Sequence, residues 1–176
     1  MNRNVRGTVM DSVQEFRLPR YNEIPNVGLY LEQTAKYVSE YLEPLQDVTV
    51  TTSMISNYVK KGLVANPVHK QYDRDQIAYL IFIAVVKTVL SMENIGQFLE
   101  LQKRAYPCDK AYEYFRMELE NVVKFVFGCK EELENIGSED TDEKILLRNT
   151  IITVAHKVYL DKCFAEMRRR NAEKQD

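Results

Sequence analysis

Eight mainly apolar residues in the second half of the chain are spaced alternately three and four positions apart. This is the spacing of one face of an α-helix, and it restricts the segment more than any other feature of the sequence does. The series consists of Tyr112, Phe115, Leu119, Val122, Val126, Cys129, Leu133 and Ile136. It predicts one long helix from Pro107 to Ile136, with Gly128 in its interior.

A second periodic stretch follows a predicted break at residues 137–140 and carries two apolar stripes. One stripe holds Leu147, Ile151, Val154 and Val158, and beside it lie Ile152, Ala155 and Tyr159. Because two stripes need two neighbours, we expect a helical hairpin over residues 106–170 that also presents a dimerisation surface to a second chain. Residues 171–176 are expected to form a tail.

The first half of the chain predicts shorter helices with recognisable ends. Apolar residues at helical spacing begin after Leu29 and run to the helix-breaking Pro44. Thr51 or Thr52 can cap a second helix over residues 51–61, and Gly62 suits a left-handed C-terminal position. Residues 63–72, with an Asn-Pro turn, are expected to form a short wing.

Two further helices are predicted before Pro107. Asp73 and Gln76 form a capping box that opens one of them, and Ser91 can cap the other. Residues 1–28 contain two prolines and two glycines, and we expect an extended N-terminal arm there. The predicted fold is therefore all-α with a short β wing, in which a helical domain over residues 29–105 precedes the hairpin.

Composition limits the class of protein. Apolar residues make up 45% and charged residues 28% of the 176, as in ordinary globular proteins. No apolar run is long enough to cross a bilayer and the start lacks a secretory signal, so we expect a cytoplasmic protein without a membrane partner. Three widely spaced cysteines and two distant histidines favour neither a disulfide framework nor a metal site. A Ser/His/Asp hydrolase is disfavoured, because there is no glycine-flanked serine and neither histidine has an evident partner motif. We expect no enzyme, no catalytic residues and no cofactor.

Charge is distributed unevenly along the chain, although the net charge is only −2. Residues 49–92 carry five basic and two acidic side chains, whereas residues 93–143 carry six basic and thirteen acidic ones. A locally basic region in an acidic chain suits a local contact with phosphate. The acidic stretch should stay away from nucleic acid.

The predicted helix over residues 51–61 has one apolar and one polar side. Small polar side chains and a lysine share the polar side at helical spacing: Ser53, Ser56, Asn57 and Lys60. Such side chains can approach base edges in the major groove of DNA, and an asparagine can bond an adenine edge bidentately. The competing interpretation is an ordinary solvated helix face. Around this helix, the further candidate DNA contacts are Thr52, Lys61, His69, Lys70, Tyr72 and Arg74.

Residues 55–64, Pro67 and residues 70–72 resemble the helix-turn-helix and wing of the MerR class of bacterial regulators. In that class an Ile and a Tyr on the reading helix precede a basic pair, Gly-Leu, a wing proline and an aromatic residue. Residues 91–95 are similar to the start of the fourth helix of the class. Ser56 and Asn57 depart from the usual arginine and aromatic residue, so an operator sequence does not carry over.

A closer resemblance, over about residues 16–105, is to domain-of-unknown-function family 1836, a group of MerR-like regulators from Gram-positive bacteria. It rests on residues 18–21 (Leu-Pro-Arg-Tyr), the region of Gln33, and residues 52–72. The resemblance implies a winged helix-turn-helix domain that binds duplex DNA as a homodimer and regulates transcription.

Two other functions remain open from the sequence. The hairpin could make the chain an interaction adaptor that keeps the winged-helix fold without binding DNA. Alternatively, the aromatic residues after position 105 could line a pocket for a small-molecule effector, although their spacing also suits an ordinary core.

Overall fold

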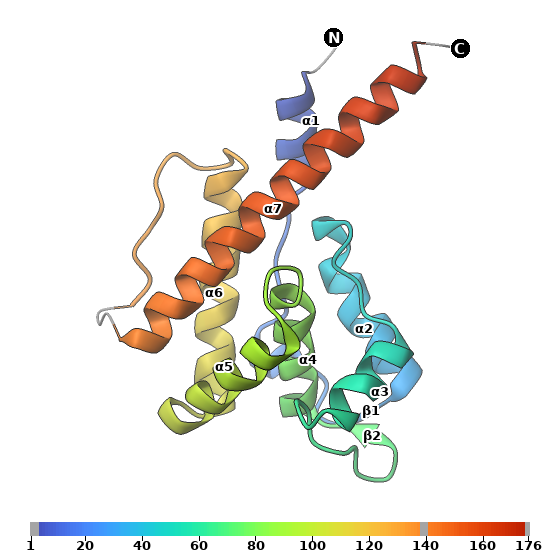
Figure 1. The fold of residues 1–176 in the computed structure, drawn as a ribbon, viewed down its shortest axis with the longest axis vertical. Helices are drawn as coiled ribbons and strands as arrows, with labels where there is room; N and C mark the ends of the chain where they lie inside the picture. The colour runs from blue at the N-terminus through green and yellow to red at the C-terminus, as the bar shows by residue number, and fades with distance from the viewer. Residues whose placement is uncertain (1–3, 138–140, 175–176) are drawn as a thin grey trace.

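The computed structural model describes residues 4–137 and 141–174, which form a mostly helical fold with a two-stranded antiparallel sheet (Figure 1). The all-α prediction with a short β element is thus confirmed. The α-helices are α1 (Val5–Asp11), α2 (Leu31–Leu42), α3 (Thr52–Lys60), α4 (Arg74–Val86), α5 (Met92–Ala105), α6 (Cys108–Val126) and α7 (Asp142–Ala172). The remaining elements are the 3₁₀ turns η1 (Tyr21–Glu23) and η2 (Glu43–Leu45) and the strands β1 (Leu29–Tyr30) and β2 (Gln71–Tyr72).

Helix α4 is the centre of the core. Its apolar residues are buried on all sides, from Ile77 through Val86 apart from Tyr79. A helix that is apolar all round needs neighbours all round, and α4 packs against α2, α6 and α7. Helix α4 therefore joins the α2–α3 region to the C-terminal helices.

Helices α6 and α7 pack against each other, but they run in the same direction, so the predicted hairpin is wrong. Tyr114, Glu118 and Phe127 lie against Lys144, Arg148 and Tyr159 of α7, in that order. After Gly128 the chain runs back along α6, where the carbonyls of Glu134 and Ile136 accept hydrogen bonds from Asn121 and Tyr114, and α7 therefore begins beside the N-terminal half of α6.

Helix α7 crosses the molecule diagonally, and its C-terminal part lies beside α1 (Figure 1). The predicted tail at 171–176 begins too early, because α7 continues to Ala172. Residues 175–176, residues 138–140 of the predicted break and residues 1–3 of the predicted arm lie outside the described residues.

The prediction of one helix from Pro107 to Ile136 is wrong, because α6 ends at Val126. Gly128 adopts φ +77°, which a helix cannot contain. The N–H of Gly128 donates to the carbonyl of Phe125 at 3.0 Å, and the N–H of Cys129 to that of Lys124 at 2.8 Å. These two bonds satisfy helix-end carbonyls in the Schellman pattern, so Gly128 ends the helix.

The prediction of an extended arm over residues 1–28 is also wrong. Asn4 caps α1 by accepting a hydrogen bond from the Gly7 N–H at 2.8 Å. The apolar residues that follow are buried in the core: Val9, Val13, Phe16, Leu18 and Ile24. Burying these side chains offsets the entropy of ordering the segment, which therefore packs between α6, α7 and α4.

Within the described ranges, no helix combines the length and apolarity needed to cross a membrane.

Candidate nucleic-acid interface

Helix α3 has well-defined ends. Its N-terminus is capped by Thr51, whose hydroxyl accepts the Met54 N–H at 3.2 Å. Gly62 follows the helix at φ +74°, with its N–H on the Val59 carbonyl at 2.9 Å and the Leu63 N–H on the Tyr58 carbonyl at 3.0 Å. The predicted cap and C-terminal glycine are confirmed, and they fix the length of a short helix.

The two sides of α3 differ as the sequence predicted. Ile55 and Tyr58 are buried, and burial raises the pKa of the Tyr58 hydroxyl. The side chains on the opposite face are exposed: Ser53, Ser56, Asn57 and Lys60. The Ser56 hydroxyl donates to the Thr52 carbonyl at 3.0 Å, and Thr52 itself is half-buried. This face is a small polar surface, and the buried Ile55 and Tyr58 on the other side of α3 hold the helix against the core.

Residues 68–71 form a tight β-turn beside α3. Val68 and Gln71 exchange both backbone hydrogen bonds, at 3.1 and 2.9 Å. Between them, His69 and Lys70 adopt φ +51° and +64° and are exposed. Two consecutive positive φ angles characterise a type I′ turn, which normally favours Asn-Gly. Here two bulky residues occupy the strained positions and project His69 and Lys70 from the surface.

The predicted wing differs in its strand pairing. Residues 63–72 contain no hairpin of two full strands, because β2 pairs with β1 in the register Leu29 with Tyr72 and Tyr30 with Gln71. Within residues 63–72, the only strand-like pairing is the isolated bridge between Val68 and Gln71. The strand that supports the turn therefore comes from the segment before α2.

Tyr72 and Arg74 lie apart from the exposed candidate residues. Tyr72 is 4% exposed, and burial raises the pKa of its hydroxyl. The Arg74 Nε donates to the Ile24 carbonyl at 2.8 Å, and its guanidinium lies 5.4 Å from the Tyr21 ring centroid. Both predicted DNA contacts are instead engaged in holding the fold, which leaves Lys61, His69 and Lys70 exposed beside α3.

Gln76 holds the loop between α3 and the turn. Its Nε2 donates to the carbonyls of Ala65 and Asn66, at 2.9 and 3.2 Å. Its Oε1 accepts the Asp73 N–H at 2.8 Å while Asp73 accepts the Gln76 N–H at 2.9 Å, so the predicted capping box is confirmed. The sequence predicted the cap, but the second role of Gln76 depends on tertiary contacts.

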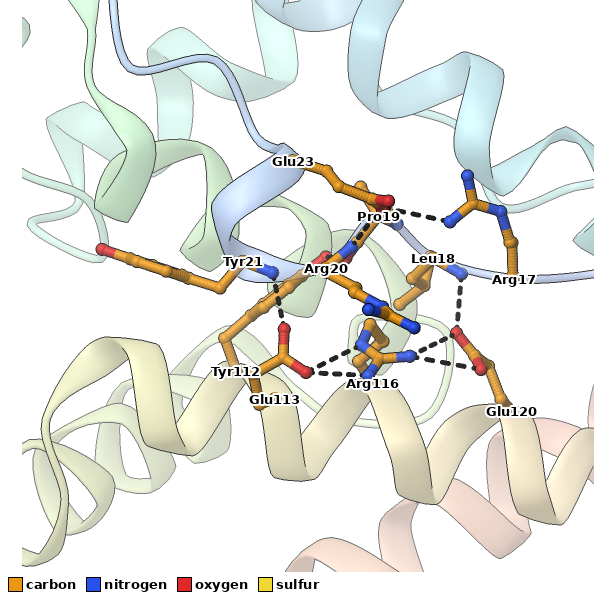
Figure 2. Close-up of polar contacts among 10 residues, drawn as sticks. All are labelled: Arg17, Leu18, Pro19, Arg20, Tyr21, Glu23, Tyr112, Glu113, Arg116 and Glu120. Carbon is orange, nitrogen blue, oxygen red and sulfur yellow. Dashed lines mark hydrogen bonds and ion pairs between the residues drawn. The ribbon is translucent and has the colours of Figure 1, made fainter.

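A polar cluster on α6 binds the N-terminal segment (Figure 2). Arg116 forms ion pairs with Glu113 at 2.7 Å and Glu120 at 3.2 Å. These carboxylates accept backbone N–H groups, from Tyr21 at 2.6 Å and from Leu18 at 2.9 Å. Burial alone would raise the pKa of Glu113, but the hydrogen bonds from Arg116 and the Tyr21 N–H outweigh it and lower that pKa.

The same segment continues to the start of α4. The Tyr112 hydroxyl donates to the Pro19 carbonyl at 2.9 Å, and the Tyr21 hydroxyl bonds Asp75. With the Arg74 bond to Ile24, residues 18–24 thus join α6 to the first turn of α4. The sequence indicated residues 18–21 only through a family resemblance. Their structural role is to fix α4, and through Gln76 the loop beside α3.

The region around α3 and the turn carries only positive charge. Residues 48–72 contain no Asp or Glu, and their three lysines are exposed. No group of three or more His, Cys, Asp or Glu suited to a metal ion occurs in the described part of the chain. The surface formed by α3 and the turn is therefore locally basic, which favours contact with anionic groups.

The comparison with protein families matches residues 19–115 to DUF1836, a domain of unknown function. The match begins in the segment bound by α6 and ends within α6, so it contains α2 to α5 and the surface described above. Comparison with curated proteins and with solved structures gives no match. Because the match covers more than half of the chain, the protein belongs to the DUF1836 family.

Proposed function

We propose that this protein is a MerR-like transcriptional regulator that binds duplex DNA through the winged helix-turn-helix formed by α3 and the turn at residues 68–71. The observation that carries the proposal is the exposed polar face of α3, flanked by exposed lysines and lacking any carboxylate between residues 48 and 72. In the proposed mechanism α3 enters the major groove, where Ser53, Ser56 and Asn57 face base edges.

Phosphate contacts would come from the flanking cations. Lys60, at the C-terminal end of the polar face, the adjoining Lys61 and Lys70 at the turn are all exposed. Lysines set affinity and register without reading sequence, while the amide of Asn57 discriminates between bases. His69 lies beside Lys70 on the same turn and would contact the same stretch of the DNA phosphate backbone.

This division of roles predicts two kinds of variant. On a preferred duplex selected from a random pool, Lys61→Ala or Lys70→Ala should weaken binding about tenfold at 0.1 M salt, and equally on a scrambled duplex, because each chain loses one phosphate contact. Asn57→Ala should instead reduce discrimination at one base pair by about 1–3 kcal/mol. Fluorescence anisotropy measures both. Identical behaviour of the lysine and asparagine variants would contradict the assignment.

The strained turn gives a prediction that separates stability from binding. Replacing His69 with Asn and Lys70 with Gly restores the residues that a type I′ turn favours, and should raise the free energy of unfolding by about 1 kcal/mol. The same double variant should bind DNA more weakly, since the Lys70 charge is lost. Urea denaturation and anisotropy measure the two effects. A variant that is less stable than the wild type would show that the turn is not strained.

We further propose that the protein acts as a homodimer through α7. Leu160, Phe164 and Met167 lie on one face of this helix and are 52%, 55% and 45% exposed. Paired C-terminal helices would place two α3 helices for two half-sites. Phe164→Glu should convert a dimer into the 20.6 kDa monomer by light scattering, whereas Val27→Glu, at an 83% exposed position elsewhere, should not. A wild-type protein that is monomeric at all concentrations would exclude this interface.

A further inference from the structure

A half-open apolar cavity of about 240 Å³ lies between α4, α5, α6 and α7. Three phenylalanines form much of its wall. The Phe82 ring centroid lies 5.3 Å from that of Phe98, with the rings tilted, and 5.2 Å from that of Phe115, with the rings edge to face. Tyr79 and Tyr112 add further aromatic surface. None of the residues that line the cavity belongs to α2, α3 or the turn at residues 68–71, so it is separate from the proposed DNA surface.

The size and walls of the cavity define the shape of a ligand. An apolar cavity of about 150 Å³ in an engineered protein holds benzene, so 240 Å³ holds a molecule of about two rings. Aromatic walls favour a flat, apolar ring system that can stack or meet ring edges. Small-molecule sites commonly combine such walls with a few polar groups at fixed positions.

Polar groups in the walls are largely engaged within the protein. The Tyr114 hydroxyl donates to the Ile136 carbonyl at 2.9 Å, and the Gln102 amide to the Tyr106 carbonyl at 2.8 Å. Burial, and secondly the charge of Asp75, raise the pKa of the Cys108 thiol to about 12, so this thiol is neutral and not a nucleophile. The lining therefore favours reversible, non-covalent binding.

The rim of the cavity carries two lysines and one glutamate: Lys110, Lys144 and Glu143. Lys144 Nζ lies 5.2 Å from the Tyr114 ring centroid, and no carboxylate of residues 4–137 or 141–174 comes within 4 Å of this nitrogen. Its position over a ring keeps the ammonium at the rim without neutralising it. An anionic group on a ligand seated in the cavity can pair with it.

We propose that this cavity binds a planar aromatic carboxylate of about two rings, with the rings between Phe82, Phe98 and Phe115 and the carboxylate at Lys144. The proposal does not depend on DNA binding, because it rests on the cavity and its rim alone. Binding fills apolar space in the folded protein only, so the ligand stabilises the fold.

The test uses 2-naphthoate as the probe and 2-naphthylmethanol as its uncharged match. At saturation 2-naphthoate should raise the melting temperature by a few degrees, and calorimetry should give one site per chain. Ala111→Phe places a ring inside the cavity and should abolish binding while keeping the melting temperature at or above that of the wild type. A wild-type protein that binds neither compound, or an Ala111→Phe variant that binds 2-naphthoate as before, would overturn the proposal.

Lys144→Met tests the charged contact separately. It should weaken 2-naphthoate about fivefold and leave 2-naphthylmethanol unchanged, since the ammonium is at the half-exposed rim. Lys157→Met, on the same helix and outside the cavity lining, is the matched control and should change neither affinity. Equal weakening of both probes by Lys144→Met would contradict the carboxylate contact. If Ala111→Phe changes the oligomeric mass of the protein, the cavity is a contact site for a second copy of the chain, and the proposal of a small-molecule ligand is overturned.

Discussion

Replacing Arg148 with Ala is expected to lower the free energy of unfolding by about 3–5 kcal/mol at pH 7, the cost of leaving a buried charge without its partner. The side chain of Glu118 is fully buried between α6 and α7, and its Oε1 lies 3.4 Å from Arg148 Nε. Within the described residues neither oxygen of this carboxylate accepts a hydrogen bond. Urea denaturation of the wild type and the variant measures the loss.

The size of this loss should depend on pH. Burial raises the pKa of Glu118, while Arg148 and Lys130 act against this shift. Because the pKa of Glu118 is higher in the folded protein than in the unfolded chain, where it is about 4.3, protonation of Glu118 favours the folded state. This contribution to stability is complete below the unfolded pKa and is lost as the pH rises through the folded pKa. Removing Arg148 raises the folded pKa further, so the penalty of Arg148→Ala should shrink as the pH falls from 7 towards 4.5.

The double variant Glu118→Leu with Arg148→Met is the matched control, because it removes both charges and keeps apolar volume. Its stability should lie close to that of the wild type or above it. A double variant as unstable as Arg148→Ala would show that Arg148 acts mainly through its bonds to Asn135 Oδ1 and the Glu134 carbonyl, at 2.9 and 3.3 Å, and not by pairing with Glu118.

Replacing Arg116 with Ala is expected to cost about 2–4 kcal/mol, because it leaves two half-buried carboxylates unpaired. Glu113 and Glu120 are 33% and 18% exposed, so water offsets part of the loss that a fully buried pair would cause. Hydrogen exchange should accelerate most at the amides of Leu18 and Tyr21, which these carboxylates bind.

The control for Arg116→Ala is Lys36→Ala, which removes an ion pair to Glu40 whose side chains are 78% and 63% exposed. It should change the free energy of unfolding by less than about 0.5 kcal/mol. Arg116→Lys should recover part of the stability, since one ammonium cannot bond both carboxylates as the guanidinium does. If exchange at Leu18 and Tyr21 is unchanged in Arg116→Ala, the cluster does not hold the N-terminal segment.

Local signals predicted much of the fold. The Asp73–Gln76 capping box and the Ser91 cap appear where the sequence placed them, with Ser91 Oγ accepting the Asn94 N–H at 3.1 Å. Gly62 was correctly predicted to end α3. Gly128 ends α6 by the same hydrogen-bonding pattern, but the apolar spacing continues past it and led to a helix that is too long.

Tertiary contacts account for what the sequence did not predict. The spacing of Val9, Val13 and Phe16 was a signal for the buried N-terminal segment, yet nearby prolines favoured an extended arm. Arg74 was predicted to contact phosphate because it is basic and follows the wing. Its partner, the Ile24 carbonyl, lies fifty positions away along the chain, and no local pattern reveals such a bond. Exposure on α3 was easier to predict because helical spacing determines it directly.

The proposed role of α3 and the turn is tested most directly by the salt dependence of DNA binding by the full-length protein. Anisotropy with a labelled duplex, titrated between about 0.05 and 0.3 M salt, gives the slope of log K against log salt concentration. A dimer that uses Lys60, Lys61 and Lys70 of each chain should give a slope of about −5. Absent binding, or an affinity that does not change with salt, would contradict DNA recognition by this surface.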